Sequence, residues 1–200
     1  MTPIERAGYI AHSMSKGYQN KLAKAQDLIG SHPDYAVSVS WGKDSIVLLH
    51  LVSQILSCVV ALHGRYQNIN EHIADTDRVR DAMLGRDDMA HVEYHEIAIA
   101  GEWDMFERAG GAFCIAKTDK QKEALQWWIN NKWSAKANEA VLAHGCIGSF
   151  VGMRQDEARA RRITIATKGN DYQKADGDKI CLPIARWTGA DIWAYIVSRH

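Results

Sequence analysis

The stretch YAVSVSWGKDSIVLLHL, residues 35–51, constrains the fold more than any other part of the chain. Its first half is rich in β-branched residues and stops at Ser40, and an apolar helical pattern begins at about Asp44. A buried strand that runs through a tight turn into a covered helix is typical of a doubly wound α/β sheet. The amino terminus of such a helix carries partial positive charge, so this turn is suited to an anion.

The side chains of the turn SWGKDS agree with that interpretation. Gly42 lets backbone amides approach a ligand, while Ser40, Lys43 and Ser45 offer two hydroxyls and an ammonium around the same spot. Asp44 has two interpretations, because it could cap the helix or help to hold Mg²⁺ beside phosphates.

Two well-known phosphate-binding templates do not describe the turn. The Walker A pattern G-x-x-x-x-G-K-S/T fails at both ends, since Val37 and Asp44 occupy its first and last positions. The dinucleotide fingerprint G-x-G-x-x-G is absent as well. On this turn alone, an ordinary capped βα connection remains the alternative.

The periodicity of the remaining chain predicts alternating strands and helices. Apolar and β-branched runs indicate about five strands in a mostly parallel sheet, at residues 35–40, 58–63, 91–99, 146–153 and 163–167. Helices are expected at residues 4–29, 46–56, 69–84 and 118–143, and a last helix is expected after Thr188. We therefore expect one domain over residues 1–200, with an amino-terminal helix (1–30) and an α/β core (35–200) covered by helices on both faces.

Composition narrows the function classes. Lys plus Arg and Asp plus Glu both number 24, so the chain lacks the overall positive charge of a non-specific nucleic-acid binder. A local basic patch, and with it a nucleic-acid partner, remains an open alternative. The apolar stretches are far shorter than the about 20 residues of a membrane span, and no signal-peptide core is present, so we expect a cytoplasmic protein without a membrane partner.

The four cysteines are scattered at Cys58, Cys114, Cys146 and Cys181. No C-x-x-C pair and no Cys/His cluster with zinc or iron–sulfur spacing occurs in the sequence. We therefore expect unpaired structural thiols and no iron–sulfur cluster.

Three stretches together resemble a known family. SVSWGKDSIVLLHL is similar to the PP-loop (S-G-G-x-D-S) of the adenine-nucleotide α-hydrolase superfamily, and to that of the phosphoadenosine phosphosulfate (PAPS) reductase group in particular. FVGMRQDEARARR, at 150–162, and LPIARWTGADIWAYI, at 182–196, resemble two further segments of that group in the same order. The resemblance implies a Rossmann-like adenine-nucleotide α-hydrolase fold.

The resemblance also implies roles for the residues of the first motif. Ser40, Gly42, Lys43, Asp44 and Ser45 would cradle the phosphate or sulfate end of ATP, adenosine phosphosulfate (APS) or PAPS, with Lys43 and Asp44 in catalytic roles. Trp41 replaces the usual glycine. Its ring either lies over the nucleotide or packs outward against the neighbouring helix.

The second motif would place Gly152 and Arg154 at the end of the fourth strand, with Arg154 as a further catalytic residue that contacts phosphate or sulfate. Arg161 could contact the nucleotide too. Asp156 could pair with these arginines or bind Mg²⁺ together with Asp44. His63 ends the second strand, near the place where this fold accepts adenine, although a structural role is the alternative.

The third motif has mainly structural features, and we expect Trp187 and Trp193 to pin the last helix onto the sheet edge. The carboxy-terminal E-C-G-I/L-H motif of thioredoxin-dependent PAPS reductases is not present. Two enzymatic hypotheses follow. The chain is an oxidoreductase of sulfur metabolism that reduces a nucleotide-bound sulfate, or it is an ATP pyrophosphatase for sulfur transfer or nucleic-acid modification.

Both hypotheses leave room for a redox or sulfur-carrier protein partner, and the amphipathic first helix could mediate a homodimer. A non-catalytic nucleotide-binding module is the third hypothesis.

Overall fold

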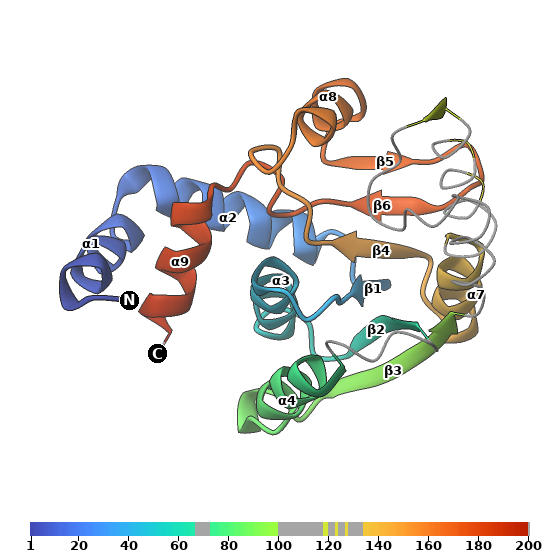
Figure 1. Ribbon diagram of the computed structural model, residues 1–200, viewed down its shortest axis with the longest axis horizontal. Coiled ribbons are helices and arrows are strands. Elements are labelled where there is room, and N and C mark those ends of the chain that lie inside the picture. The colour runs from blue at the N-terminus through green and yellow to red at the C-terminus, as the bar shows by residue number, and fades with distance from the viewer. Residues whose placement is uncertain (67–72, 100–117, 120–122, 124–126, 128–133, 200) are drawn as a thin grey trace.

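The computed structural model describes residues 1–66, 73–99, 118–119, 123, 127 and 134–199 (Figure 1). This part forms a six-stranded sheet with the strand order β3-β2-β1-β4-β6-β5. The strands are β1 (Tyr35–Ser38), β2 (Val59–Tyr66), β3 (Val92–Ile99), β4 (Gly148–Val151), β5 (Asp171–Gln173) and β6 (Lys179–Cys181). Only the β5–β6 pair is antiparallel. The predicted Rossmann-like, mostly parallel sheet is therefore confirmed.

Two strand predictions differ from the structure. The segment 163–167, predicted as a strand, lies inside helix α8 (Arg159–Lys168). Of its β-branched residues only Ile165 is buried, in a cluster with Ile180 and Leu182. A single buried position needs only one face of a helix, so a helix can bury Ile165 as well as a strand could. The short strands β5 and β6 were not among the predicted strands; each has three residues, and β5 is largely exposed and pairs with β6 alone.

The helical predictions hold with one clear exception. The expected helix 4–29 is two helices, α1 (Pro3–Ser13) and α2 (Lys16–Gly30), because Ser15 accepts a hydrogen bond from the Tyr18 amide and caps a new start. The other elements are α3 (Lys43–Ser53), α4 (Ile73–Leu84), the 3₁₀ helix η1 (Asp87–Met89), α7 (Ala135–Ala143) and α9 (Gly189–Ser198). Most of the helix predicted for 118–143 lies outside the described residues, and α7 is its carboxyl end.

Helices cover both faces of the sheet, as a doubly wound fold requires. Alternate residues of β1 divide between the faces: Val37 packs in a cluster with residues of α2 and α3, whereas Ala36 packs with Val60, Leu62 and the α7 residue Val141. None of the described helices is long and apolar enough to cross a membrane.

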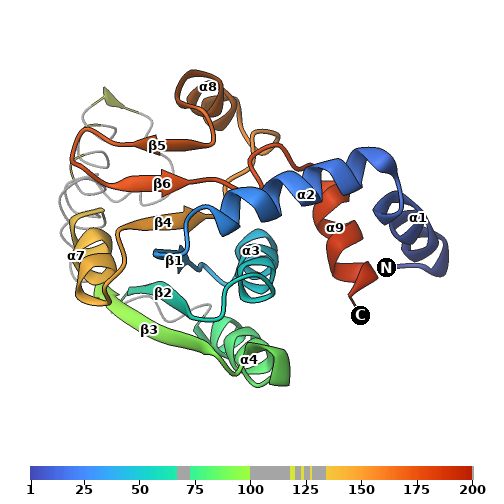
Figure 2. The same cartoon turned by 180° about the vertical axis from the view of Figure 1, so that it is seen from behind.

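Helices α1 and α9 lie side by side at one end of the molecule, and both views place α7 at the other end (Figures 1 and 2). Trp187, before α9, is 1% exposed and packs against the rings of Tyr18 and Tyr195. Trp193 is partly exposed and contacts Tyr9 of α1. Both tryptophans therefore hold α9 against the amino-terminal helices, and not onto the sheet edge as expected.

Asp191 is the polar centre of this end of the molecule. Its side chain is 1% exposed and accepts hydrogen bonds from Lys21 Nζ at 2.6 Å, from the Thr188 amide at 2.6 Å and from His12 Nε2 at 2.8 Å. Burial alone raises the pKa of Asp191, but these hydrogen bonds prevail and lower it to about 2.

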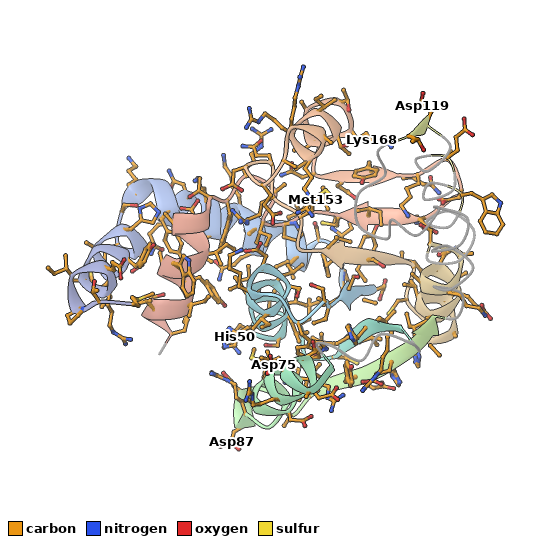
Figure 3. The ribbon with its side chains drawn as sticks, viewed as in Figure 1. His50, Asp75, Asp87, Asp119, Met153 and Lys168 are labelled. Atoms are coloured by element: carbon orange, nitrogen blue, oxygen red, sulfur yellow. The ribbon has the colours of Figure 1, made fainter. Side chains whose placement is uncertain are left out.

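We predict that Asp191→Asn lowers the free energy of unfolding by about 2–4 kcal/mol at neutral pH, because the buried carboxylate and its charge-assisted hydrogen bonds to Lys21 and to the Thr188 amide are lost. The folded-state pKa lies below the unfolded-state value, so the stabilisation is present above pH 4 or so and disappears as the pH falls toward 2. Urea unfolding followed by circular dichroism measures both effects. Asp75→Asn, at an exposed ion pair (Figure 3), is the control and should change stability by less than about 0.5 kcal/mol; equal effects of the two substitutions would contradict the prediction.

Candidate nucleotide site

The turn SWGKDS lies where the direction of strand order reverses. The chain passes from β1 outward through β2 to β3 and then returns to β4, on the other side of β1. Ligands of doubly wound sheets bind at the carboxyl ends of the strands at such a switch point. A cavity of about 660 Å³ opens there, lined from the ends of β1, β2 and β4 and from the start of α3. Met153, labelled in Figure 3, is one of its lining residues.

Most of the predicted site residues meet in this cavity. The predicted residues that line it are Ser40, Gly42, Lys43, Asp44, Ser45, His63, Gly152 and Arg161. Three others, Trp41, Arg154 and Asp156, do not line it and lie behind or beside its wall.

Helix α3 begins without a side-chain cap. Gly42 occupies the N-cap position in extended conformation, so Asp44 is not the cap that it could have been. Ser45 Oγ instead donates to the Gly42 carbonyl at 2.9 Å and accepts from the Ser40 amide at 3.2 Å. These bonds close the turn through its own hydroxyl and leave amides at the helix start for an anion.

Gly152 allows the segment after β4 to approach that helix start. A Cβ atom at this position would lie 3.2 Å from both Cα and N of Ser45 and 3.3 Å from the carbonyl carbon of Asp44. Any larger residue would push the two segments apart, so Gly152 sets the width of the cavity at this point.

An ion-pair cluster lies directly behind the cavity wall. Arg154 is 4% exposed, and its Nε lies 3.3 Å from Asp44 Oδ1 while its Nη1 donates to Asp156 Oδ1 at 2.5 Å. The Glu157 carboxylate accepts a hydrogen bond from the Arg154 amide and also forms an ion pair with Arg161. The pairing interpretation of Asp156 is thus seen directly, and its second oxygen accepts from the Gly189 amide at 3.1 Å.

Asp44 is the aspartate of this cluster that lines the cavity. Its Oδ2 accepts from Lys43 Nζ at 3.2 Å, but its buried Oδ1 makes no hydrogen bond. Because Oδ1 faces the Arg154 guanidinium at 3.3 Å, Oδ2 is the oxygen that could serve as a ligand for Mg²⁺ at the cavity, whereas both oxygens of Asp156 are engaged.

Trp41 packs into the protein. The indole is 5% exposed and lies against the rings of Tyr94, with centroids 5.5 Å apart, and His63, at 6.3 Å. Its backbone has φ 60°, the left-handed region that favours glycine. The ring therefore packs against strand residues and belongs to the same buried cluster as residues of the neighbouring helix α3.

The wall opposite α3 comes from β2. His63 Nδ1 bonds the Val39 carbonyl at 2.8 Å, and Arg65, two residues further, also lines the cavity. Hydrogen bonds to Glu96 and Asp77 raise the pKa of Arg65. Sequence reasoning missed Arg65 and Asp77; strand alternation after His63 could have indicated Arg65, but its partners come from distant elements.

Comparison of the sequence with known protein families identifies the family of this chain. A scan against protein families matches residues 34–200 to the phosphoadenosine phosphosulfate reductase domain. The chain belongs to the PAPS reductase family. A search of curated proteins gave no match.

Two solved structures share the fold of this PAPS reductase family member. The U34-tRNA thiolase NcsA from Methanococcus maripaludis, with its 4Fe–4S cluster, matches 90% of this chain at 12% identity and a TM-score of 0.58. The match covers 64% of the thiolase chain, less than two thirds of its length. The NMN synthetase from Francisella tularensis matches 90% of this chain at 13% identity, with a TM-score of 0.50 and 71% of its own chain covered.

The thiolase corrects one expectation. Because its fold, shared with this chain, carries a 4Fe–4S cluster, scattered cysteine spacing did not justify the prediction of no iron–sulfur cluster. Among the described cysteines, Cys146 and Cys181 are buried and Cys58 is exposed, and no three of them gather as a ligand group; Cys114 lies outside the described residues. The described cysteines alone therefore do not form the ligand set of a cluster.

We predict that Trp41→Gly lowers the free energy of unfolding by about 2–4 kcal/mol, since lost packing of the indole outweighs relief of the left-handed backbone. Because the ring does not line the cavity, ATP affinity should change less than about threefold. Urea unfolding and calorimetric titration measure the two quantities. Trp193→Ala, at a partly exposed indole, is the control with a smaller stability change. A tenfold loss of affinity in a folded Trp41→Gly protein would show that the ring contacts the nucleotide.

Proposed function

We propose that this PAPS reductase family member binds an adenine nucleotide with the phosphate or sulfate chain against the SWGKDS turn, and that it acts chemically at that chain. The observation that carries the proposal is the convergence of an uncapped helix start, the Lys43 ammonium and the Ser40 hydroxyl on one cavity at the switch point of the sheet. Each of these groups favours negative charge.

Lys43 is the group that an incoming phosphate would engage. Its side chain is 44% exposed and has Asp44 as its acidic partner at 3.2 Å. A phosphate or sulfate oxygen would give this ammonium a second negatively charged acceptor. The ammonium would then stabilise the negative charge that develops on the phosphate or sulfate chain during bond cleavage.

Arg154 acts in this proposal as a positioning residue. Its guanidinium is buried behind Asp44 and is shared with Asp156, so it holds the Asp44 carboxylate at the mouth of the cavity. When Mg²⁺ is bound, it would neutralise phosphate charge, and the Asp44 carboxylate, which lines the cavity, is the group that would hold it.

The position of the thiols bears on the choice between reactions. Reduction of a nucleotide-bound sulfate needs a thiolate at the sulfur atom. Burial raises the pKa of Cys146 and raises that of Cys181 to about 12, and no described cysteine lines the cavity. For sulfate reduction, the thiol would come from Cys114 or from a partner protein.

This observation favours a second candidate, an ATP pyrophosphatase that works with a sulfur-carrier or nucleic-acid partner. The thiolase and the synthetase show that enzymes of this fold serve tRNA thiolation and NMN synthesis. The turn would hold the leaving pyrophosphate while the partner supplies the acceptor. A nucleotide-binding module without turnover is the remaining alternative, and turnover assays separate it from both enzymes.

We predict that at least one of ATP, APS and PAPS binds with a dissociation constant below about 1 mM, and that Lys43→Ala weakens its binding at least about tenfold. The loss of one charge-assisted contact to the phosphate chain is the reason. Isothermal titration calorimetry with each nucleotide measures the effect. Lys168→Ala, on α8 beside Tyr172, removes an equal charge elsewhere and should leave affinity unchanged. Equal affinities of the Lys43→Ala and wild-type proteins would refute the site.

Turnover distinguishes the two reactions. In the pyrophosphatase, cleavage of the bond between the α and β phosphates of ATP releases pyrophosphate, and we expect release to rise when tRNA or a thiol-bearing partner is added. In the reductase, a dithiol attacks the sulfur of PAPS or APS, expels the nucleotide and releases sulfite as a disulfide forms. Pyrophosphate and sulfite assays on the same protein decide between them, and binding without either product would favour the non-catalytic module.

A further inference from the structure

A second group of potential ligands lies apart from the nucleotide cavity, on strand β3 and helix α7. Glu93 and His95 are two residues apart on β3, so their side chains point to the same face of the sheet. Their parallel neighbours on β2 are Val60 and Leu62, which belong to the cluster that α7 covers. His144 is the C-cap residue of α7, so it reaches the same place from the helix that covers this face.

The three side chains converge closely. Glu93 Oε1 lies 2.7 Å from His95 Nε2, and the rings of His95 and His144 stack with centroids 3.6 Å apart and planes 25° from parallel. One ligand atom from each of the three residues lies within 4.8 Å of the others. Among the described residues, these three make the only such group of metal-ligating side chains.

Stability alone does not account for this arrangement. The Glu93 side chain is 60% exposed, so its ion pair with His95 is worth little in water. The strand order makes β3 an edge strand, where polar side chains need no close partner. These side chains nevertheless bring two imidazoles and one carboxylate together, which is a ligand set that borderline divalent metals prefer.

We propose that Glu93, His95 and His144 form a binding site for a divalent transition metal of the Zn²⁺ class, distinct from the nucleotide site. Three protein ligands leave a fourth position for water in tetrahedral geometry. The ligand atoms need to lie about 3.5 Å from one another for bonds of about 2.0–2.1 Å, which requires the stacked rings to turn and the 2.7 Å contact between Glu93 Oε1 and His95 Nε2 to lengthen.

The metal would tie the edge of the sheet to a crossover. Helix α7 contacts β2, β3 and β4, and Gly145, at φ 73°, turns the chain from its end toward β4. None of the three ligands lines the nucleotide cavity, so the site would stabilise the α7 end of the molecule (Figure 1) and take no part in nucleotide binding. Hard cations such as Mg²⁺ should bind poorly, because imidazole nitrogen suits softer metals.

The test is calorimetric titration of the untagged, chelator-treated, reduced protein with Zn²⁺ alone. We expect one ion per chain with a dissociation constant below about 10 µM, and a rise in Tm of at least about 3 °C at saturating Zn²⁺. His95→Ala and His144→Ala should each weaken binding at least about tenfold, because loss of even an outer-shell partner has an effect of that size. Glu93→Gln should weaken binding too. A Co²⁺ absorption spectrum with tetrahedral intensity should be present in the wild type and lost in both histidine variants.

Two control variants locate the ion. Cys58→Ser removes an exposed thiol just ahead of β2, and His12→Ala removes an imidazole at the far end of the molecule; both should leave Zn²⁺ affinity unchanged. Circular dichroism of the apo variants establishes that each is folded. Absence of stoichiometric binding to the wild type, or unchanged affinity in folded His95→Ala and His144→Ala proteins, overturns the proposal. A loss confined to Cys58→Ser would place the ion on the thiol and overturn it as well.

Discussion

The ion pair between Asp44 and Arg154 joins the two halves of the candidate site. Asp44 stands in the first turn of α3, and Arg154 follows β4, so the pair bridges the switch point of the sheet. Both side chains are nearly buried, and a buried charge without its partner is costly. Gly152 makes the bridge possible, because a Cβ atom there would press on the same turn. The cavity exists where it does because these two segments are held this close.

The same cluster connects the site to the carboxyl-terminal helix. Asp156 accepts from Arg154 and from the Gly189 amide, at the first residue of α9. Two residues later, Asp191 binds Lys21 and His12 of the amino-terminal helices. Ion pairs and a backbone hydrogen bond therefore link three motifs that are far apart in sequence, from the SWGKDS turn to the amino-terminal helices.

Local sequence signals predicted the elements that depend on local chemistry. The β1 strand, the turn and α3 were predictable because periodicity changes sharply at the turn, and the motifs placed Gly152 and Arg161 at the same cavity. The strand predicted at 163–167 was wrong because tertiary packing of Ile165 decides in favour of a helix. Arg65 and its partners Asp77 and Glu96 could not be paired from sequence, since three separate elements bring them together. The roles in nucleotide binding remain predictions.

Trp41 shows why an unusual residue can belong in such a turn. A non-glycine residue at φ 60° has a conformational cost of about 1 kcal/mol or more, and burial of an indole offsets it. The ring packs between Tyr94 and His63, and His63 is fixed in turn by its bond to the Val39 carbonyl. Glycine would ease the backbone but would leave the β2 wall without this support. The tryptophan therefore packs behind the β2 wall, against His63, without lining the cavity.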